Sequence, residues 1–202
     1  YMETDEKHNN YFVYFNFFVF SMLLLVMSSN FLVMFFGWEL VGLSSYLLIS
    51  FWSKKTAAAK AGNKAFILNR VGDFGFLIGL MLILNTFNTF DFYTILKNAS
   101  DVPENTITLI TLFLLLGAFG KSAQFPLFSW LPDAMEGPTP ASALIHAATM
   151  VTAGVFMLVR ISPILQHSKI AGMVIISFGL ITALLAAFSA INQYDIKKVL
   201  AY

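Results

Sequence analysis

The sequence contains no cysteine and few charged residues. Without a thiol, the chain forms no disulfide and supplies no thiolate ligand to zinc or to an iron–sulfur cluster. Charged residues occupy 11% of its 202 positions, whereas a soluble domain typically carries roughly 25%. The formal net charge is +1, and basic residues form no cluster of the kind that neutralises phosphates, so we expect no nucleic-acid partner.

Motifs typical of soluble enzymes are also missing. The sequence shows no glycine-rich phosphate-binding loop, no cluster of metal-ligand residues and no nucleophile triad. Its glycines are scattered through apolar segments, where small residues usually allow helices to pack closely. We therefore expect no cofactor and no metal ion to be bound by this chain itself.

Hydrophobic residues, in contrast, make up 58% of the chain. They gather in six stretches of the length that crosses a bilayer as a helix. These predicted spans cover residues 12–27, 31–51, 65–84, 106–131 with an interruption at Pro126, 140–161 and 169–191. Backbone groups in hydrocarbon must bond within their own segment, and the solidly apolar runs do not alternate as barrel strands do. The sequence thus predicts an all-α integral membrane protein, a polytopic bundle of about six transmembrane helices with one broken at a proline.

Lysines indicate how the bundle is oriented. They are concentrated in the loop after the second span and beyond the sixth span, at Lys54, Lys55, Lys60, Lys64, Lys197 and Lys198. Both regions fall on one side, which the positive-inside rule assigns to cytoplasm or matrix. An acidic turn on the same side, with Arg160 and Lys169 near the opposite one, weakens this bias. The chain begins at Tyr1 and ends where a further helical pattern starts, as expected of a segment of a longer protein.

Ionisable residues inside the predicted spans are the candidate functional residues, because a charge at mid-membrane costs roughly 2.5–3.5 kcal/mol or more. Glu39 lies near the middle of the second span, with Gly42 near its face. It is either a transport residue or a structural carboxylate bonded to another helix. Lys121 lies deep in the fourth span, just before Pro126, which leaves the carbonyl four residues earlier without its donor. A broken helix beside a buried lysine is typical of transporters; the alternative is a kinked helix whose lysine reaches the interface.

Two further ionisable residues are more ambiguous. Asp73, in the third span, follows Arg70 by three positions, so it either takes part in transport or forms a local ion pair near the membrane surface. His146, in the fifth span, shares a predicted face with Ser142 and Thr149. This polar face suits a proton relay, although a lone membrane histidine can also be a packing residue.

A Pro/Gly-rich turn precedes the fifth span. Thr139 is predicted to cap that helix, and Pro140 suits its first turn. Asp133 and Glu136, in the same turn, are interpreted as solvated residues rather than catalytic ones.

The motifs around these residues resemble the subunit 5 family of NADH dehydrogenases, the antiporter-like subunits of respiratory complex I. The resemblance covers nearly the whole chain and rests on residues 37–42, 69–74, 120–126, 130–140, 142–155 and 195–202. It implies two inverted five-helix repeats, each forming a proton half-channel, with residues 1–162 as the first repeat and residues 163–202 as the start of the second. By motif, Glu39 resembles the channel glutamate and Lys121 the broken-helix lysine, while Asp73 and His146 match accessory positions of the relay.

The resemblance also implies a mechanism and partners. Lys121 and Glu39 are expected to face each other and to titrate as a coupled pair, with His146 and bound water passing the proton onward. Other membrane-arm subunits, lipid, and a second chain or missing segments are the expected partners. NADH, FMN, iron–sulfur clusters and ubiquinone belong to other subunits in this interpretation. The expected location is the mitochondrial inner membrane, or alternatively a bacterial plasma membrane or plastid thylakoid. A subunit of a multi-subunit sodium/proton antiporter, the plastid relative and a purely structural fragment remain alternative interpretations.

Overall fold

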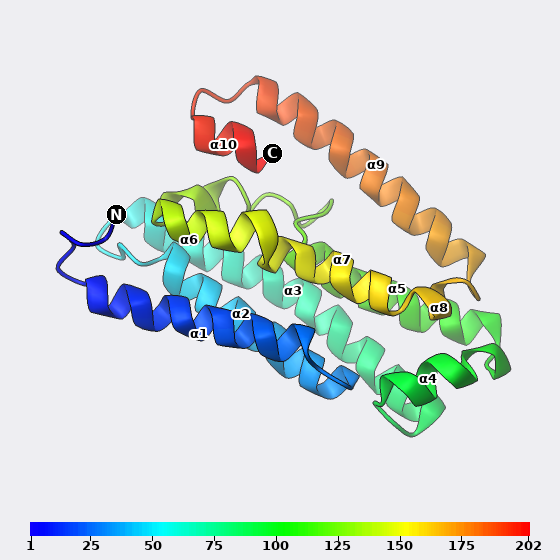
Figure 1. Ribbon diagram of the computed structural model, residues 1–202. Helices are drawn as coiled ribbons and strands as arrows, with labels where there is room; N and C mark the ends of the chain where they lie inside the picture. Colours follow the sequence, from blue (N-terminus) through cyan, green and yellow to red (C-terminus); the bar gives the residue numbers. More distant parts are fainter.

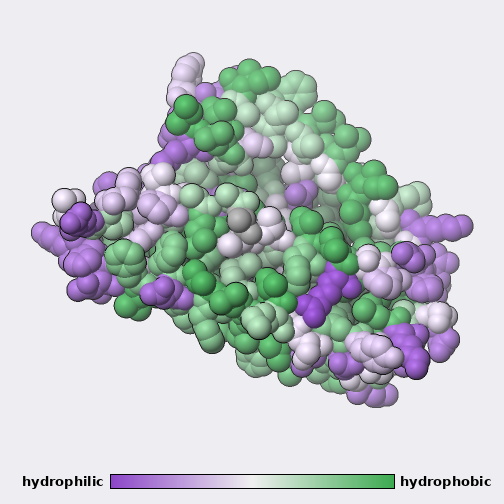
Figure 2. Space-filling model, in the orientation of Figure 1, coloured by the Kyte–Doolittle hydropathy of each residue, from purple (hydrophilic) through white to green (hydrophobic). Residues whose placement is uncertain are grey.

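The protein is a bundle of membrane-length helices, in agreement with the predicted all-α fold. The computed structural model describes residues 1–202, except for the side chain of Ala148. Among the described residues, six helical segments are long and apolar enough to cross a membrane. They are α1 (His8–Val26), α2 (Phe31–Ile49), α3 (Thr56–Phe87), α5 (Glu104–Lys121), the segment Thr139–Arg160 and α9 (Lys169–Ile191). Hydrophobic residues dominate the middle of the face seen in Figure 2, and hydrophilic residues gather at its two ends.

The short elements mark the two ends of the bundle. The amino-terminal segment, α6 (Thr139–Ala143) and α10 (Ile196–Ala201) lie at one end, whereas α4 (Phe92–Asn98) and α8 (Ser162–Leu165) lie at the other (Figure 1). Two further short elements are η1 (Ala99–Asp101) and η2 (Asp133–Glu136). The lysines after α2 and those of α10 therefore lie at the same end of the bundle. The sequence predicts this, because an even number of spans precedes each group.

Helices α1 and α2 form a tight hairpin. Asn30 caps α2, because its side chain accepts a hydrogen bond from the backbone N–H of Val33 at 2.8 Å. The two helices approach so closely that a Cβ on Gly37 would lie 2.6 Å from the backbone nitrogen of Leu25. A glycine at this crossing is thus what brings α1 against α2.

The third helix is longer than predicted. We expected a span over residues 65–84 after a lysine-rich loop, but α3 begins at Thr56 and contains both Lys60 and Lys64. Its first turns include three consecutive alanines, which strongly favour helix, and long lysine side chains are compatible with a helix that continues into water. The predicted loop therefore shrinks to residues 50–55, and α3 extends beyond the apolar layer.

The fourth span ends earlier than predicted. Helix α5 stops at Lys121 rather than continuing to residue 131 with a break at Pro126. The chain turns away at Ala123, whose φ of 48° lies in the left-handed region. Pro126 has no N–H to restart a helical ladder, and residues 122–132 contain turns instead. Lys121 consequently occupies the end of a buried helix, next to irregular backbone.

The fifth span is continuous but irregular. Helix α6 passes into a wider π-helical turn, η3 (Leu144–Ala148), and then into α7 (Met150–Arg160). The predicted cap is wrong: Pro138 occupies the cap position and Thr139 is the first helical residue, whose hydroxyl bonds the phenol of Tyr1 at 3.2 Å. A single π turn of this kind often marks a functional position in a helix.

Helix α9 matches the predicted span 169–191 residue for residue and stands partly apart from the bundle (Figure 1). Phe178 stacks on Phe119 of α5 with ring centroids 4.9 Å apart. The hydroxyl of Thr182 accepts a hydrogen bond from the backbone N–H of Phe125 at 2.9 Å. The division at residue 162 into a first repeat and the start of a second stays a prediction.

Candidate proton-transfer site

A lysine with no exposed surface forms the centre of the candidate site. Lys121, at the end of α5, has a relative exposure of 0%, and its partner Asp73 on α3 has 3%. The Lys121 Nζ atom lies 3.4 Å from Asp73 Oδ2. A buried charge is tolerated only when it is paired and hydrogen-bonded, so this carboxylate is what allows a lysine at that position.

Helix crossing positions the pair. A Cβ on Gly72 would lie 2.9 Å from the Cα of Gly120, so α3 and α5 meet backbone to backbone immediately beside the two charged residues. A Cβ on Gly42 of α2 would lie 2.6 Å from Lys121 Nζ. Gly42 therefore provides the space that the ammonium group occupies, in addition to the helix-packing role that its sequence position indicates.

Trp38 holds the second oxygen of the carboxylate. Its indole Nε1 donates a hydrogen bond of 2.7 Å to Asp73 Oδ1, and its ring lies 5.9 Å from Lys121 Nζ. The ring is fully buried and makes an edge contact with Phe76, centroid to centroid 5.0 Å. Asp73 is thus fixed by a neutral donor on one oxygen and a cation on the other.

Arg70 links this pair to Glu39. Arg70 Nη1 forms an ion pair with Glu39 Oε2 and lies 3.8 Å from Asp73 Oδ2. The side chains of Arg70 and Glu39 are 37% and 23% exposed, so they form the outer part of the cluster. The two acidic and two basic groups make a balanced row, in the order Glu39, Arg70, Asp73, Lys121.

The pairing differs from the one we expected. The sequence motif predicts that Lys121 faces Glu39, but within the described residues the carboxylate paired with Lys121 is Asp73. The local Arg70–Asp73 pair of the alternative interpretation is present, at 3.8 Å. Asp73 is buried rather than exposed at the surface, however, and it also contacts Trp38 of α2 and Lys121 of α5. The sequence analysis recorded Arg70 only as a local neighbour of Asp73 and Trp38 only as part of the motif at residues 37–42, without predicting its hydrogen bond to Asp73.

His146 lies apart from this row, in the π-helical turn. Its two ring nitrogens are buried and have no hydrogen-bond partner in the described part of the chain. It lines a cavity of about 260 Å³ that also contains Ser142 and Lys197. Of the three residues predicted to share a polar face, Ser142 and His146 line this cavity. Thr149 does not line it, and its hydroxyl donates to the carbonyl of Leu144 instead.

Trp130 connects the two regions. Its ring centroid lies 5.9 Å from that of His146, and its indole N–H donates to the carbonyl of Gly120 at 3.1 Å. His146 is therefore separated from the end of α5 by one aromatic ring. Direct proton transfer between His146 and Lys121 would need water that passes around this ring.

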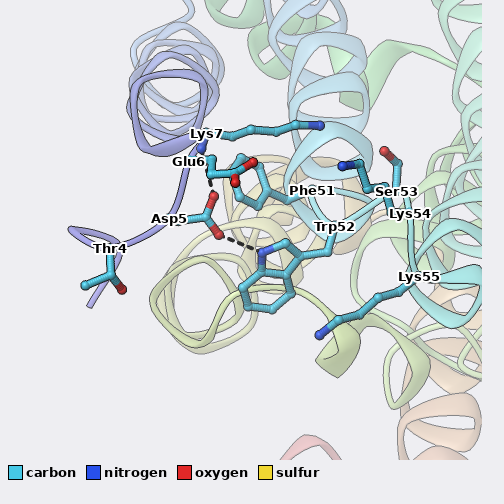
Figure 3. Close-up of a pocket in the computed structure, with 9 residues that line it drawn as sticks. All are labelled: Thr4, Asp5, Glu6, Lys7, Phe51, Trp52, Ser53, Lys54 and Lys55. Atoms are coloured by element: carbon cyan, nitrogen blue, oxygen red, sulfur yellow. Dashed lines mark hydrogen bonds between the residues drawn. The ribbon is translucent and has the colours of Figure 1, made fainter.

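A separate surface hollow of about 350 Å³ lies at the amino-terminal end of the bundle, away from the buried charges (Figure 3). There Asp5 accepts hydrogen bonds of 2.9 Å from Trp52 Nε1 and from the backbone N–H of Lys7. The bond from Trp52 is the main reason that the pKa of Asp5 lies below its ordinary value of 3.8. Asp133 is likewise paired, with Lys64 Nζ at 2.7 Å, although both side chains are 42% exposed.

The described residues contain no group of three or more His, Asp or Glu side chains that would hold a metal ion. The row instead places the amine of Lys121, which can carry a proton, beside the carboxylate of Asp73, while the guanidinium of Arg70 stays charged. Such coupled groups exchange protons in steps that belong to the set rather than to one residue. The chemistry that this arrangement supports is proton transfer inside the membrane.

Comparison with known proteins gives consistent matches. Residues 28–202 match the family described as NADH:quinone oxidoreductase/Mrp antiporter, TM. The chain is 54% identical over 202 residues to NADH-ubiquinone oxidoreductase chain 5 of Rhizopus stolonifer, covering all of this chain and 31% of the relative. It is 53% identical over 212 aligned residues to NADH-quinone oxidoreductase subunit L of a Neisseria meningitidis serogroup B strain, covering 98% of this chain and 32% of the relative.

A solved structure is also similar. The chain matches a chain in the structure of the Mrp complex from Dietzia sp. DQ12-45-1b with a TM-score of 0.91 and 32% sequence identity, covering 96% of this chain and 22% of that one. The chain thus spans about a third of the length of the curated relatives it matches.

Proposed function

Since the chain belongs to the NADH:quinone oxidoreductase/Mrp antiporter membrane family, we propose that it translocates protons as part of the membrane arm of respiratory complex I. Electron transfer from NADH to ubiquinone, in other subunits that carry the flavin and iron–sulfur clusters, supplies the energy. The names of the first-matched relatives, chain 5 and subunit L of NADH dehydrogenases, support this assignment. The ubiquinone form of the name in fungal and plant relatives favours the mitochondrial inner membrane.

The observation that carries the proposal is the enclosed Asp73–Lys121 pair. At 3.4 Å and an effective dielectric constant of about 20, two unit charges attract by about 5 kcal/mol. A lysine without exposed surface depends on this attraction to keep its proton. Any change that draws the charge of Asp73 elsewhere therefore promotes release of the proton from Lys121.

Arg70 provides such a change. In the structure its Nη1 atom pairs with Glu39 and also lies 3.8 Å from Asp73, whereas Lys121 is closer to Asp73, at 3.4 Å. If Glu39 is neutralised or moves, Arg70 is free to pair more closely with Asp73, and Lys121 loses its counter-charge and its proton. A return of Arg70 to Glu39 allows Lys121 to be protonated again. This two-position exchange is how the row would couple events at Glu39 to proton transfer at Lys121.

The test is Lys121→Ala in the intact complex, reconstituted in vesicles. We expect the complex to assemble and proton pumping coupled to NADH oxidation to be lost. Lys121→Arg is the matched control, since it keeps the positive charge but, unlike lysine, cannot release its proton under working conditions. Pumping at the normal ratio of protons to NADH in an assembled Lys121→Ala complex would rule out the central role of this lysine.

A second candidate function is cation/proton exchange in an Mrp-type antiporter, which the similarity to the Dietzia structure favours. Native electrophoresis of solubilised source membranes separates the two functions. Peptides of this chain in a band that oxidises NADH support complex I. Their presence in a smaller complex without that activity, together with sodium-dependent proton transport, would support the antiporter, whereas assembly without any transport would leave a scaffolding role.

A further inference from the structure

The backbone directly after Lys121 reverses in a defined turn. The N–H of Gln124 donates to the carbonyl of Phe119 at 3.0 Å, and Ala123 has a φ of 48°, in the left-handed region. This combination is the Schellman motif, in which one left-handed residue closes a helix and the next N–H reaches back to a carbonyl of its last turn. Lys121 is the last residue of α5, so the turn determines where its backbone lies.

The next amide finds its acceptor on another helix. The N–H of Phe125 donates to Thr182 Oγ1 of α9 at 2.9 Å, across 57 positions of sequence. The hydroxyl of Thr182 donates in turn to the carbonyl of Phe178, one turn earlier in α9, at 2.7 Å. Because a hydroxyl has one hydrogen, its oxygen can only be the acceptor for Phe125. A backbone N–H at membrane depth needs such a partner within the protein, and Thr182 supplies it.

Aromatic contacts join α9 to the same turn. The ring of Phe178 stacks on that of Phe119 at 4.9 Å and lies 6.2 Å from that of Phe125, centroid to centroid. Phe119 precedes Lys121 by two positions, and Phe125 follows it by four. Helix α9 thus contacts the chain on both sides of Lys121, while Asp73 of α3 pairs with its ammonium group.

Helix α9 has few other attachments to the bundle. Among the described residues, Ala171 is its one buried residue. Close to it, the hydroxyl of Ser168 bonds that of Thr108 on α5 at 2.6 Å. Farther along, a cavity of about 430 Å³ lies between α5, α7 and α9, and a Cβ on Gly179 would meet no atom within 4 Å. The hydrogen bond of Thr182 therefore holds α9 to the turn at a place where packing is open.

We propose that Thr182 is a positioning residue for Lys121. Its hydroxyl fixes the turn that ends α5 and so keeps the ammonium group of Lys121 beside Asp73. Thr182 gains and loses no proton. A shift of α9 would break the bond to Phe125 and release the turn, so proton transfer at Lys121 depends on the position of the helix that is predicted to begin the second repeat. This inference rests on the proposed function, because it takes Lys121 as the residue whose proton moves.

The first experiment measures the bond without turnover. Thr182→Val keeps the size and branching of the side chain but cannot accept a hydrogen bond, whereas Thr182→Ser keeps the hydroxyl. Hydrogen exchange at the Phe125 amide is followed in the intact complex by mass spectrometry with fragmentation to single amides. Exchange should become about tenfold faster or more in Thr182→Val and return towards the original rate in Thr182→Ser. An unchanged rate in Thr182→Val would overturn the inference.

Thr111 of α5 provides the matched control. It is fully buried, and its hydroxyl donates to the carbonyl of Ile107 in its own helix at 2.8 Å. Thr111→Val makes the same chemical change without touching the turn, so exchange at Phe125 and proton pumping should both stay normal. Equal effects of Thr111→Val and Thr182→Val would indicate a general loosening of the bundle and refute a specific role of Thr182.

The second experiment measures proton pumping in vesicles. We expect a several-fold fall in protons translocated per NADH in assembled Thr182→Val, with recovery in Thr182→Ser. Thr182→Ala removes the acceptor without placing a methyl group where the hydroxyl was, so it gives the same test if Thr182→Val assembles poorly. Faster exchange with normal pumping, alongside loss of pumping in Lys121→Ala, would overturn this inference and leave the proposed function intact. Normal pumping in Thr182→Val and in Lys121→Ala would overturn both.

Discussion

Replacing Asp73 by asparagine tests the energetic basis of the site. Asparagine keeps the shape of the side chain and an oxygen that can still accept the 2.7 Å bond from Trp38, but it removes the counter-charge of Lys121. The attraction lost is about 5 kcal/mol at a dielectric constant near 20. Breaking a buried ion pair from one side typically costs about 3–5 kcal/mol. We therefore expect Asp73→Asn to lower the thermal stability of the subunit strongly and to abolish pumping.

A matched control is the ion pair between Lys64, on the same helix as Asp73, and Asp133 of η2. The Lys64–Asp133 pair is shorter, at 2.7 Å, than the Asp73–Lys121 pair, at 3.4 Å. Distance alone would make the pair at the surface the stronger one. Both of its side chains are 42% exposed, however, and ion pairs in contact with water contribute about 0–1 kcal/mol. Asp133→Asn should therefore leave the stability nearly unchanged.

The double variant separates stability from transport. In Asp73→Asn/Lys121→Met the unpaired charge is gone, so the melting temperature of the assembled complex should recover most of the loss seen in Asp73→Asn, while pumping stays absent. The assay is thermal unfolding followed by size-exclusion chromatography, with pumping measured in vesicles. The reasoning fails if Asp73→Asn is as stable as Asp133→Asn, or if the double variant is no more stable than Asp73→Asn.

The membrane helices could be predicted from the sequence, because backbone N–H and C=O groups in hydrocarbon must bond to each other, as they do in a helix. Helix α9 follows its apolar run from end to end. The predicted ends of the third and fourth spans were wrong. Hydrophobicity indicates which residues lie in the bilayer, but it does not indicate where a helix begins or ends. Helix α3 continues through Lys60 and Lys64 because alanine-rich turns remain helical in water. Helix α5 ends at Lys121 because of backbone turns that the apolar composition of residues 122–131 conceals.

The four candidate residues were found because ionisable side chains are rare inside apolar runs. The pairings between different helices were not predicted, because each depends on how separate helices cross. The approach of Gly72 to Gly120 brings Lys121 to Asp73, and the length of Arg70 carries its charge from α3 to Glu39. The spacing of residues along one helix predicts neither the distance between two crossing helices nor the partner that a long side chain reaches.

Substitutions at Gly72, Gly42 and Asp5 provide three further predictions. Gly72→Ala places a methyl carbon 2.9 Å from the backbone of α5, so it should cost about 1–3 kcal/mol of stability, measured by thermal unfolding. A Cβ at Gly42 would lie 2.6 Å from Lys121 Nζ and 4.0 Å from Arg70 Nη2, both at the ends of long side chains, so Gly42→Ala should lower pumping while assembly persists. Lost assembly in Gly42→Ala together with unchanged stability in Gly72→Ala would contradict the packing described here. Outside the membrane, the bond from Trp52 keeps the pKa of Asp5 below 3.8. The stabilisation is thus present above that value and is lost as the pH falls through the lower, folded-state pKa. Hydrogen exchange at the amide two residues later should lose protection on acidification, and Asp5→Asn, which cannot titrate, should show no such step; an identical step in this variant would exclude Asp5 as its cause.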